Sequence, residues 1–191
     1  DWFNSAYYHK LYFERDEQEA ESFIRLLISK LQPESGSRML DVACGKGRHS
    51  RILAGMGYNV TGIDIAEQNI QHARQFENEK LEFFQHDMRL PFRINYFNYA
   101  FNFFTSFGYF KTQREHEDAI RTIAESIVAG GSIVIDYLNV HFSENQLVHQ
   151  DEKLIDGIEY HIRRWHDDTH FYKKITVKDP SNPIPQSFTE Q

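Results

Sequence analysis

The residues with the clearest chemical potential lie in one segment, 39–50, which reads Met-Leu-Asp-Val-Ala-Cys-Gly-Lys-Gly-Arg-His-Ser. An apolar stretch runs into two glycines one residue apart, and an amphipathic helical pattern follows directly. Gly45 and Gly47 can adopt positive φ and let the backbone approach a bound group closely. A strand, a glycine turn and a helix in this order direct backbone N–H groups and a helix N-terminus at a ligand.

A second acidic residue, Asp64, lies at the spacing expected between the ends of two successive strands. Asp64 lies 23 residues after Asp41 and ends a second apolar run. An acid at the tip of the second strand lies where a nucleotide-type cofactor presents its ribose hydroxyls. A dinucleotide site favours glycine or alanine where this chain has Ser50, and that departure weakens the interpretation as a nicotinamide site.

The form D-x-x-C-G-x-G over 41–47 resembles motif I of the class I S-adenosylmethionine-dependent methyltransferases. Further segments resemble later motifs of the same family: 61–64 the second motif, 83–88 the segment after the third strand, 98–104 the fourth strand, and 129–136 the turn into the fifth strand. In the last of these, Val-Ala replaces the family's Lys-Pro. The segment 7–12 resembles the tyrosine-bearing opening helix of small-molecule members, which folds over the cofactor.

The resemblance implies S-adenosylmethionine as the cofactor, and it implies a set of binding residues. Gly45 and Gly47 would let the loop backbone meet the methionine moiety, and Asp64 would accept hydrogen bonds from both ribose hydroxyls. Ile65 would pack on the adenine, and Asp87 would accept from its amino group. The complete set of expected cofactor contacts is Asp41, Ala43, Gly45, Gly47, Asp64, Ile65, Asp87, Met88 and Phe103, with Tyr8 or Tyr12 closing over the donor.

The acceptor is less clearly indicated. Family members that act on adenine N6 or on protein glutamine carry Asn/Asp-Pro-Pro-Tyr after the fourth strand, but this chain has Asn-Phe-Phe-Thr at 102–105. An aromatic-rich loop at 104–110 lies there instead. Weak candidates for acceptor contacts are Phe104, Tyr109, Tyr137, Asn139 and His141. We therefore expect methyl transfer to an O, N or C atom of a small molecule.

No catalytic residue is identified, because methyl transfer is a one-step displacement that mainly needs the reactants held in line. Two alternatives stay open: a non-catalytic S-adenosylmethionine-binding protein on the same fold, and an NAD(P)-dependent oxidoreductase. The net charge of −7 disfavours a nucleic-acid partner, which would need clustered Lys and Arg.

Composition sets further bounds. A chain of 191 residues with 40% apolar residues supports one domain with a core. No apolar run approaches the length of a membrane span, so we expect a cytoplasmic protein without membrane contact, and a homodimer is compatible with the sequence. The single cysteine, Cys44, excludes an internal disulfide and is expected to be a small buried residue. His166 and His170 flank a turn without a third ligand nearby, so no metal site is expected.

The apolar pattern predicts an α/β fold. A helix is expected over 16–31, strands near 38–43, 58–63, 81–85, 98–103 and 132–137, and helices near 47–56, 66–76 and 113–128. Alternation of this kind predicts a Rossmann-like, doubly wound, mostly parallel sheet with helices on both faces. Ligands bind such sheets beyond the carboxyl ends of the strands, where the expected site residues fall.

The C-terminal pattern differs. Residues 153–165 and 170–177 predict a β-hairpin with its turn at 167–169, and the proline-rich segment 179–185 is expected to break regular structure. The hairpin is either the fold's closing pair of strands or an insertion in a chain with an incomplete C-terminus, and the second is favoured. The expected organisation is a helical cap over 1–35, a cofactor-binding core over 36–139, and a hairpin extension over 140–191 that forms a lid on the acceptor pocket.

Overall fold

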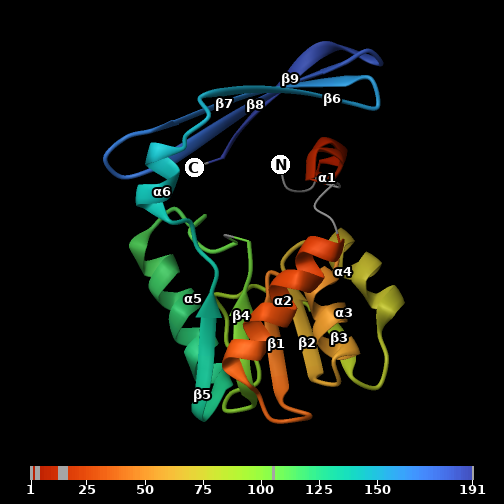
Figure 1. The fold of residues 1–191 in the computed structure, drawn as a ribbon, viewed down its shortest axis with the longest axis vertical. Helices are drawn as coiled ribbons and strands as arrows, with labels where there is room; N and C mark the ends of the chain where they lie inside the picture. Colours follow the sequence, from red (N-terminus) through yellow and green to blue (C-terminus); the bar gives the residue numbers. More distant parts are fainter. Residues whose placement is uncertain (1, 3–4, 13–16, 105, 191) are drawn as a thin grey trace. The chain divides into compact units, whose positions relative to one another are not determined.

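The computed structural model describes residues 2, 5–12, 17–104 and 106–190, without the side chains of Tyr8, His9 and Tyr12. The chain divides into two compact units (Figure 1). One unit comprises 16–137, and the other combines 1–15 with 138–191. The N-terminal region is therefore divided between the two units, and each unit is described by itself.

The larger unit is built on a five-stranded sheet in the order β3-β2-β1-β4-β5. Its strands are β1 (Arg38–Val42), β2 (Asn59–Asp64), β3 (Leu81–Gln85), β4 (Phe97–Asn102) and β5 (Ile127–Ile135). All four neighbouring pairs are parallel. The sequence order reverses between β1 and β4, which is the topological switch point of a doubly wound sheet. The predicted Rossmann-like fold class is confirmed.

Helices cover both faces of this sheet (Figure 1), and two separate apolar cores result. On one face, α2 (Glu17–Leu31), α3 (Arg48–Gly55) and α4 (Glu67–Ala73) pack through Ile24, Leu53 and Ile70. A short 3₁₀ turn, η1 (Arg74–Phe76), follows α4. On the other face, α5 (Gln113–Ser126) packs through Ile123 against Leu40 and Val42. Successive residues of β1 thus face opposite cores, as a strand requires.

The fifth strand begins earlier than predicted. Strand β5 starts at Ile127 rather than near 132, and its register with β4 shifts between the pairs Phe97–Ile127 and Tyr99–Ser132. The two glycines expected as a turn lie inside this irregularity, and Gly130 has φ +80. A Cβ on Gly131 would lie 2.6 Å from the Asn98 carbonyl oxygen. The glycines therefore permit a bulge with close backbone contact rather than a connecting turn.

The smaller unit is an antiparallel sheet in the order β6-β7-β8-β9. Its strands are β6 (Gln150–Ile155), β7 (Ile158–His166), β8 (Phe171–Asp179) and β9 (Asn182–Glu190), preceded by helix α6 (Val140–Asn145). Alternate residues of β7 and β8, including Tyr160 and Ile175, are buried on one face. Trp2 and Leu11 of the N-terminal segment complete this core, where helix α1 (Ala6–Tyr12) contributes Leu11.

The predicted hairpin exists as β7 and β8, with the side chain of Asp167 accepting backbone hydrogen bonds from Thr169 and His170 at the turn. Two expectations around it are wrong. The segment 153–165 is not one strand, because Asp156 and Gly157 both have positive φ and form a two-residue turn between β6 and β7. Asp-Gly is a strong signal for such a turn.

The proline-rich segment does not end the sheet either. Strand β9 pairs with β8, and Pro183 and Pro185 fall between the paired residues Asn182 and Gln186, where the register is irregular. Proline lacks an N–H and is tolerated on an edge strand at such an irregularity. All four C-terminal strands lie in their own sheet, so the alternative that the hairpin closes the main sheet is wrong. In the described part of the chain, no helix is both long and apolar enough to span a membrane.

Candidate functional site

The sequence-predicted acids lie along one edge of the parallel sheet. Asp41 is the last residue but one of β1, and Asp64 is the final residue of β2. Asp87 follows the end of β3 by two residues. Phe104 follows β4 by two residues. Because all five strands are parallel, their carboxyl ends meet at this edge, and the fold brings these four residues to it.

The glycine loop between β1 and α3 has an unusual backbone. Ala43, Gly45 and Gly47 all have positive φ, at 59°, 56° and 79°. The Cys44 N–H donates to the Ile63 carbonyl oxygen at 2.9 Å, which fastens the loop to β2. A Cβ on Gly47 would lie 2.5 Å from the Phe83 ring, whereas a Cβ on Gly45 would meet nothing within 4 Å. Gly47 is therefore required for packing, and Gly45 borders open space.

Asp64 fixes this loop from the tip of β2. Its Oδ2 accepts the Gly45 N–H at 2.9 Å, and its Oδ1 accepts the Ala66 N–H at 2.8 Å. The side-chain amide of Asn69 lies 3.5 Å from Oδ1. A carboxylate offers about four lone-pair positions, and two of the three donors share Oδ1, so acceptor capacity remains on Oδ2. Asp64 thus shapes the glycine loop and can still accept further hydrogen bonds.

Asp41 is buried beneath the loop. It is 1% exposed, and its Oδ2 accepts the Ser50 hydroxyl at 2.5 Å. Burial raises the pKa of Asp41 to about 7, the Ser50 hydrogen bond opposes that rise, and the charge of Asp64 adds to it. Asp41 therefore joins β1 to the first turn of α3, and its charge depends on pH near neutrality.

His49 is a buried residue of the site that sequence reasoning did not assign. It is 7% exposed, and its ring lies 4.9 Å from both Phe103 and Phe104, stacked on the latter. Burial lowers the pKa of His49 to about 3, so the imidazole is neutral at pH 7. Its Nε2 has no hydrogen-bond partner in the structure, and neither does the buried Oδ1 of Asn102 at the end of β4. The only signal in the sequence was the position of His49 two residues after Gly47.

The aromatic residue Phe104 is held in a strained conformation with φ +55. Its N–H donates to Asp136 Oδ2 at 3.0 Å, and the Asp136 N–H donates in turn to the Asn102 carbonyl at 2.8 Å. Asp136 therefore joins the ends of β4 and β5 and fixes the start of the aromatic loop. The sequence places Asp136 at the end of the segment 129–136 that resembles a family motif, but it does not predict this role for the side chain.

Asp87 and Met88 follow β3, and both are already engaged with neighbouring elements. The Asp87 carboxylate accepts hydrogen bonds from Arg89, which hold its pKa below the usual range. The Met88 carbonyl accepts the Thr122 hydroxyl of α5 at 2.5 Å. Ile65, directly after β2, is 63% exposed, an unusual setting for an isoleucine beside a conformationally fixed loop.

The remaining predicted residues are more widely distributed. Tyr109 and Tyr137 are partly exposed in the larger unit, and the Tyr137 ring lies close to Gly108. Asn139 and His141 belong to the smaller unit, where the Asn139 side chain caps α6 by accepting the Phe142 N–H. Tyr8 and Tyr12 lie in α1, but their side chains are outside the described residues.

These features fit a cofactor with a carboxylate, a ribose and a base. Gly47 is the N-cap residue of helix α3, and no side chain caps the N-terminus of this helix. A helix start of this kind favours an anionic group. Gly45 leaves open space beside the loop, Asp64 retains acceptor capacity, and the exposed Ile65 offers an apolar surface next to it.

Comparison with known proteins assigns the family. Residues 39–131 match the family model described as a methyltransferase domain. The dTDP-3-amino-3,4,6-trideoxy-alpha-D-glucopyranose N,N-dimethyltransferase of Streptomyces venezuelae is 28% identical over 165 residues, which cover 83% of this chain and 68% of that protein. Residues 39–131 are therefore a methyltransferase domain, in agreement with the resemblance of this segment to the class I S-adenosylmethionine-dependent methyltransferases. Its cofactor is S-adenosylmethionine, as the sequence predicted.

Other similarities agree with this methyltransferase assignment. Human glycine N-methyltransferase is 29% identical over 131 residues, which cover 59% of this chain and 44% of that protein. The crystal structure of Streptomyces venezuelae DesVI matches with a TM-score of 0.64 and 26% identity, over 96% of this chain and 79% of that one. The chain spans about half the length, 52% and 54%, of two further bacterial relatives.

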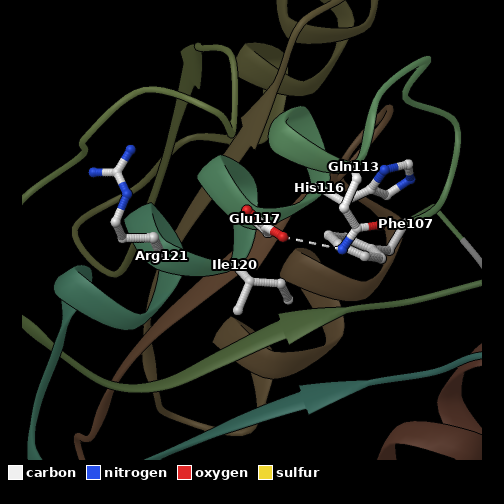
Figure 2. Close-up of a pocket in the computed structure, with 6 residues that line it drawn as sticks. All are labelled: Phe107, Gln113, His116, Glu117, Ile120 and Arg121. Atoms are coloured by element: carbon white, nitrogen blue, oxygen red, sulfur yellow. Dashed lines mark hydrogen bonds between the residues drawn. The ribbon is translucent and has the colours of Figure 1, made fainter.

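A hollow on the methyltransferase surface is lined by residues outside the glycine loop (Figure 2). It runs along the first turns of α5, and the Gln113 side-chain amide donates to Glu117 across it at 3.2 Å. Its lining residues are Phe107, Gln113, His116, Glu117, Ile120 and Arg121. None of the predicted cofactor contacts lines it. Within the described residues, no cluster of three His, Cys, Asp or Glu side chains could hold a metal ion.

Proposed function

We propose that this methyltransferase acts on an amine nitrogen of a small molecule, and that its acceptor class is the amino sugars. The observation that carries the proposal is the similarity to the amino-sugar N,N-dimethyltransferase, which extends over 83% of the chain. A match of this extent reaches beyond the glycine loop that binds the donor.

The donor is proposed to lie along the carboxyl edge of β1 and β2. The N-terminus of α3 and the Gly45 backbone would receive the methionine end, and the two ribose hydroxyls would donate to Asp64. The adenine would lie against Ile65, with its amino group donating to Asp87. Asp41, Ala43, Met88 and Phe103 would complete the donor site, and Tyr8 or Tyr12 would close over it.

When bound, S-adenosylmethionine supplies the methyl group on a positively charged sulfur, so no further activation of the methyl carbon is needed. The residues of the chain then have two tasks. They hold the acceptor nitrogen and the methyl carbon in line, and they exclude water from the site. The nitrogen must present its lone pair, so an ammonium acceptor must lose a proton before transfer.

The remaining parts of the chain are assigned roles by the same proposal. The helical segment within 1–35 is the proposed cap, and 140–191 is the proposed lid. The proposed acceptor contacts are Phe104, Tyr109, Tyr137, Asn139 and His141. The protein works in the cytoplasm, without membrane or nucleic-acid partners, and a homodimer is its proposed assembly. Sedimentation analysis tests the last point.

The test is methyl transfer from S-adenosylmethionine carrying a labelled methyl group. The acceptor panel contains a nucleotide-linked amino sugar, the same sugar nucleotide with a hydroxyl in place of the amine, and the free amino sugar. We expect label on the amine and none on the hydroxyl counterpart. Label on the hydroxyl compound would refute the amine proposal. Reduction or oxidation of a nicotinamide by the protein would instead support the oxidoreductase alternative.

A further inference from the structure

Arg89 makes an extensive set of contacts to Asp87. The Arg89 backbone N–H donates to Oδ1 at 2.9 Å, and Nη2 donates to Oδ2 at 2.6 Å. Its Nε–H is shared between the two oxygens at 3.0 and 3.1 Å. Three N–H groups of Arg89 thus donate hydrogen bonds to a carboxylate that has about four lone-pair positions. One acceptor position is left, and the guanidinium fork fixes the plane of the carboxylate.

The same guanidinium reaches the first turn of α5. Arg89 Nη1 donates to Glu115 Oε1 at 2.5 Å. The other oxygen of Glu115, Oε2, accepts the backbone N–H groups of Lys111 and Thr112, each at 3.1 Å, as part of a capping box. One carboxylate therefore ties Arg89 to the point where the aromatic loop becomes helix.

Aromatic contacts reinforce this connection. The Arg89 guanidinium lies 5.2 Å from the centre of the Phe110 ring, and His116 packs against the same ring at 5.3 Å. The side chains of Arg89, Asp87 and Glu115 are 33%, 21% and 30% exposed, so the group is partly shielded from water. Isolated surface ion pairs contribute little, but a bidentate pair within a network holds its geometry.

We propose that Arg89 is a positioning residue that orients Asp87 to recognise the 6-amino group of the donor's base and links that recognition to the order of loop 106–112. The inference rests on the proposed position of the donor. Asp87 is held as an anion by Arg89, so it presents only acceptor capacity at its remaining position. An amino group can donate there, whereas a 6-oxo group would place oxygen against carboxylate.

Base discrimination provides a readout that a merely structural role would not change. Affinities of S-adenosylhomocysteine and its inosine counterpart are measured by calorimetry. For the wild type we expect the adenine compound to bind roughly 10- to 100-fold more tightly, the range of one hydrogen bond to a charged group. In Arg89→Gln the ratio should fall to within about threefold, and Arg89→Lys, which keeps the charge but not the fork, should be intermediate.

Two further variants separate the contact of Arg89 with Glu115 from its contact with Asp87. Glu115→Gln keeps a capping-box residue but removes the charge that faces Arg89, so the helix start is retained while the link is weakened. Arg121→Gln is the matched control, because Arg121 also pairs with two acids, but these are Asp118 and Glu125 rather than Asp87 and Glu115. We expect Glu115→Gln to reduce the discrimination partly and Arg121→Gln to leave it unchanged.

Hydrogen exchange tests the link to the loop. Adding S-adenosylhomocysteine to the wild type should slow exchange of the amides in 106–112, and this effect should be lost in Arg89→Gln but kept in Arg121→Gln. If the wild type binds the ligand and discriminates the bases while Arg89→Gln does both equally well, the inference is overturned and the proposed function stands. If the wild type does not bind S-adenosylhomocysteine, both are overturned.

Discussion

Substitution of Gly47 by alanine and of Gly45 by alanine should have different main consequences, although only one residue separates the two glycines in the same loop. The Gly47→Ala substitution places a Cβ 2.5 Å from the Phe83 ring, which is 1% exposed and cannot move freely. The Gly45→Ala substitution places its Cβ in open space where the donor is proposed to lie. We expect Gly47→Ala to lower stability and Gly45→Ala to lower donor affinity.

The magnitudes follow from the local geometry. Both positions have positive φ, 56° and 79°, and a side chain in this region costs about 1–2 kcal/mol. Overpacking against a buried ring adds about 1–3 kcal/mol at Gly47 alone. The free energy of unfolding should therefore fall by about 2–5 kcal/mol in Gly47→Ala and by about 1–2 kcal/mol in Gly45→Ala.

Urea denaturation measures the two losses, and calorimetry with S-adenosylhomocysteine measures affinity. A second substitution, Phe83→Leu, provides a check, because a smaller side chain should relieve the clash with alanine at position 47 and leave the effect at position 45 unchanged. Equal losses of stability in the two alanine variants would refute the packing argument. Unchanged affinity in Gly45→Ala would refute the proposed position of the donor.

Three other substitutions have defined outcomes. Asp64→Ala should weaken S-adenosylhomocysteine binding by roughly 10- to 100-fold in calorimetry, since charged acceptors of hydrogen bonds are lost; full affinity would remove Asp64 from the site. Asp41→Asn should gain stability over the wild type as pH rises from about 4 to 7, because the raised pKa of about 7 means that the wild type loses stability as its buried carboxyl ionises. His49→Gln should show the reverse: the lowered pKa of about 3 gives the wild type stability that is present above pH 6.5 and lost as pH falls toward 3, and the variant lacks it. Urea titrations at several pH values check both slopes, and parallel curves for variant and wild type would contradict the assigned burial.

The parallel core could be predicted because its signals are local. Each strand and helix of 38–126 carries its own apolar period, and the glycines and Asp64 mark where backbone must turn. The right-handed and short connections of such units leave few possible topologies. The residues at the strand ends could therefore be assigned to the same edge of the sheet from the sequence. This explains why Asp41, Asp64 and Asp87 were assigned to one edge.

Features that depend on contacts between distant residues could not be predicted in this way. The burial of His49 arises from Phe103 and Phe104, more than 50 positions later in the chain. The contact from Arg89 to Glu115 joins the loop after β3 to the first turn of α5. The bulge in β5 arises from close approach to the Asn98 carbonyl, which a glycine pair alone does not reveal.

Two strands of the C-terminal sheet, β6 and β9, were missed for a different reason. Proline in 179–185 was interpreted as a break, although an edge strand with irregular register accepts it. The Asp156–Gly157 turn, by contrast, was a readable signal that was not used.

A crystal structure with bound S-adenosylhomocysteine tests the central claim most directly. We predict that both ribose hydroxyls donate to Asp64, that the carboxylate end meets the backbone at Gly45 and the start of α3, and that the adenine amino group donates to Asp87. A ligand bound instead in the hollow along α5, or one whose ribose lies away from Asp64, would contradict the account.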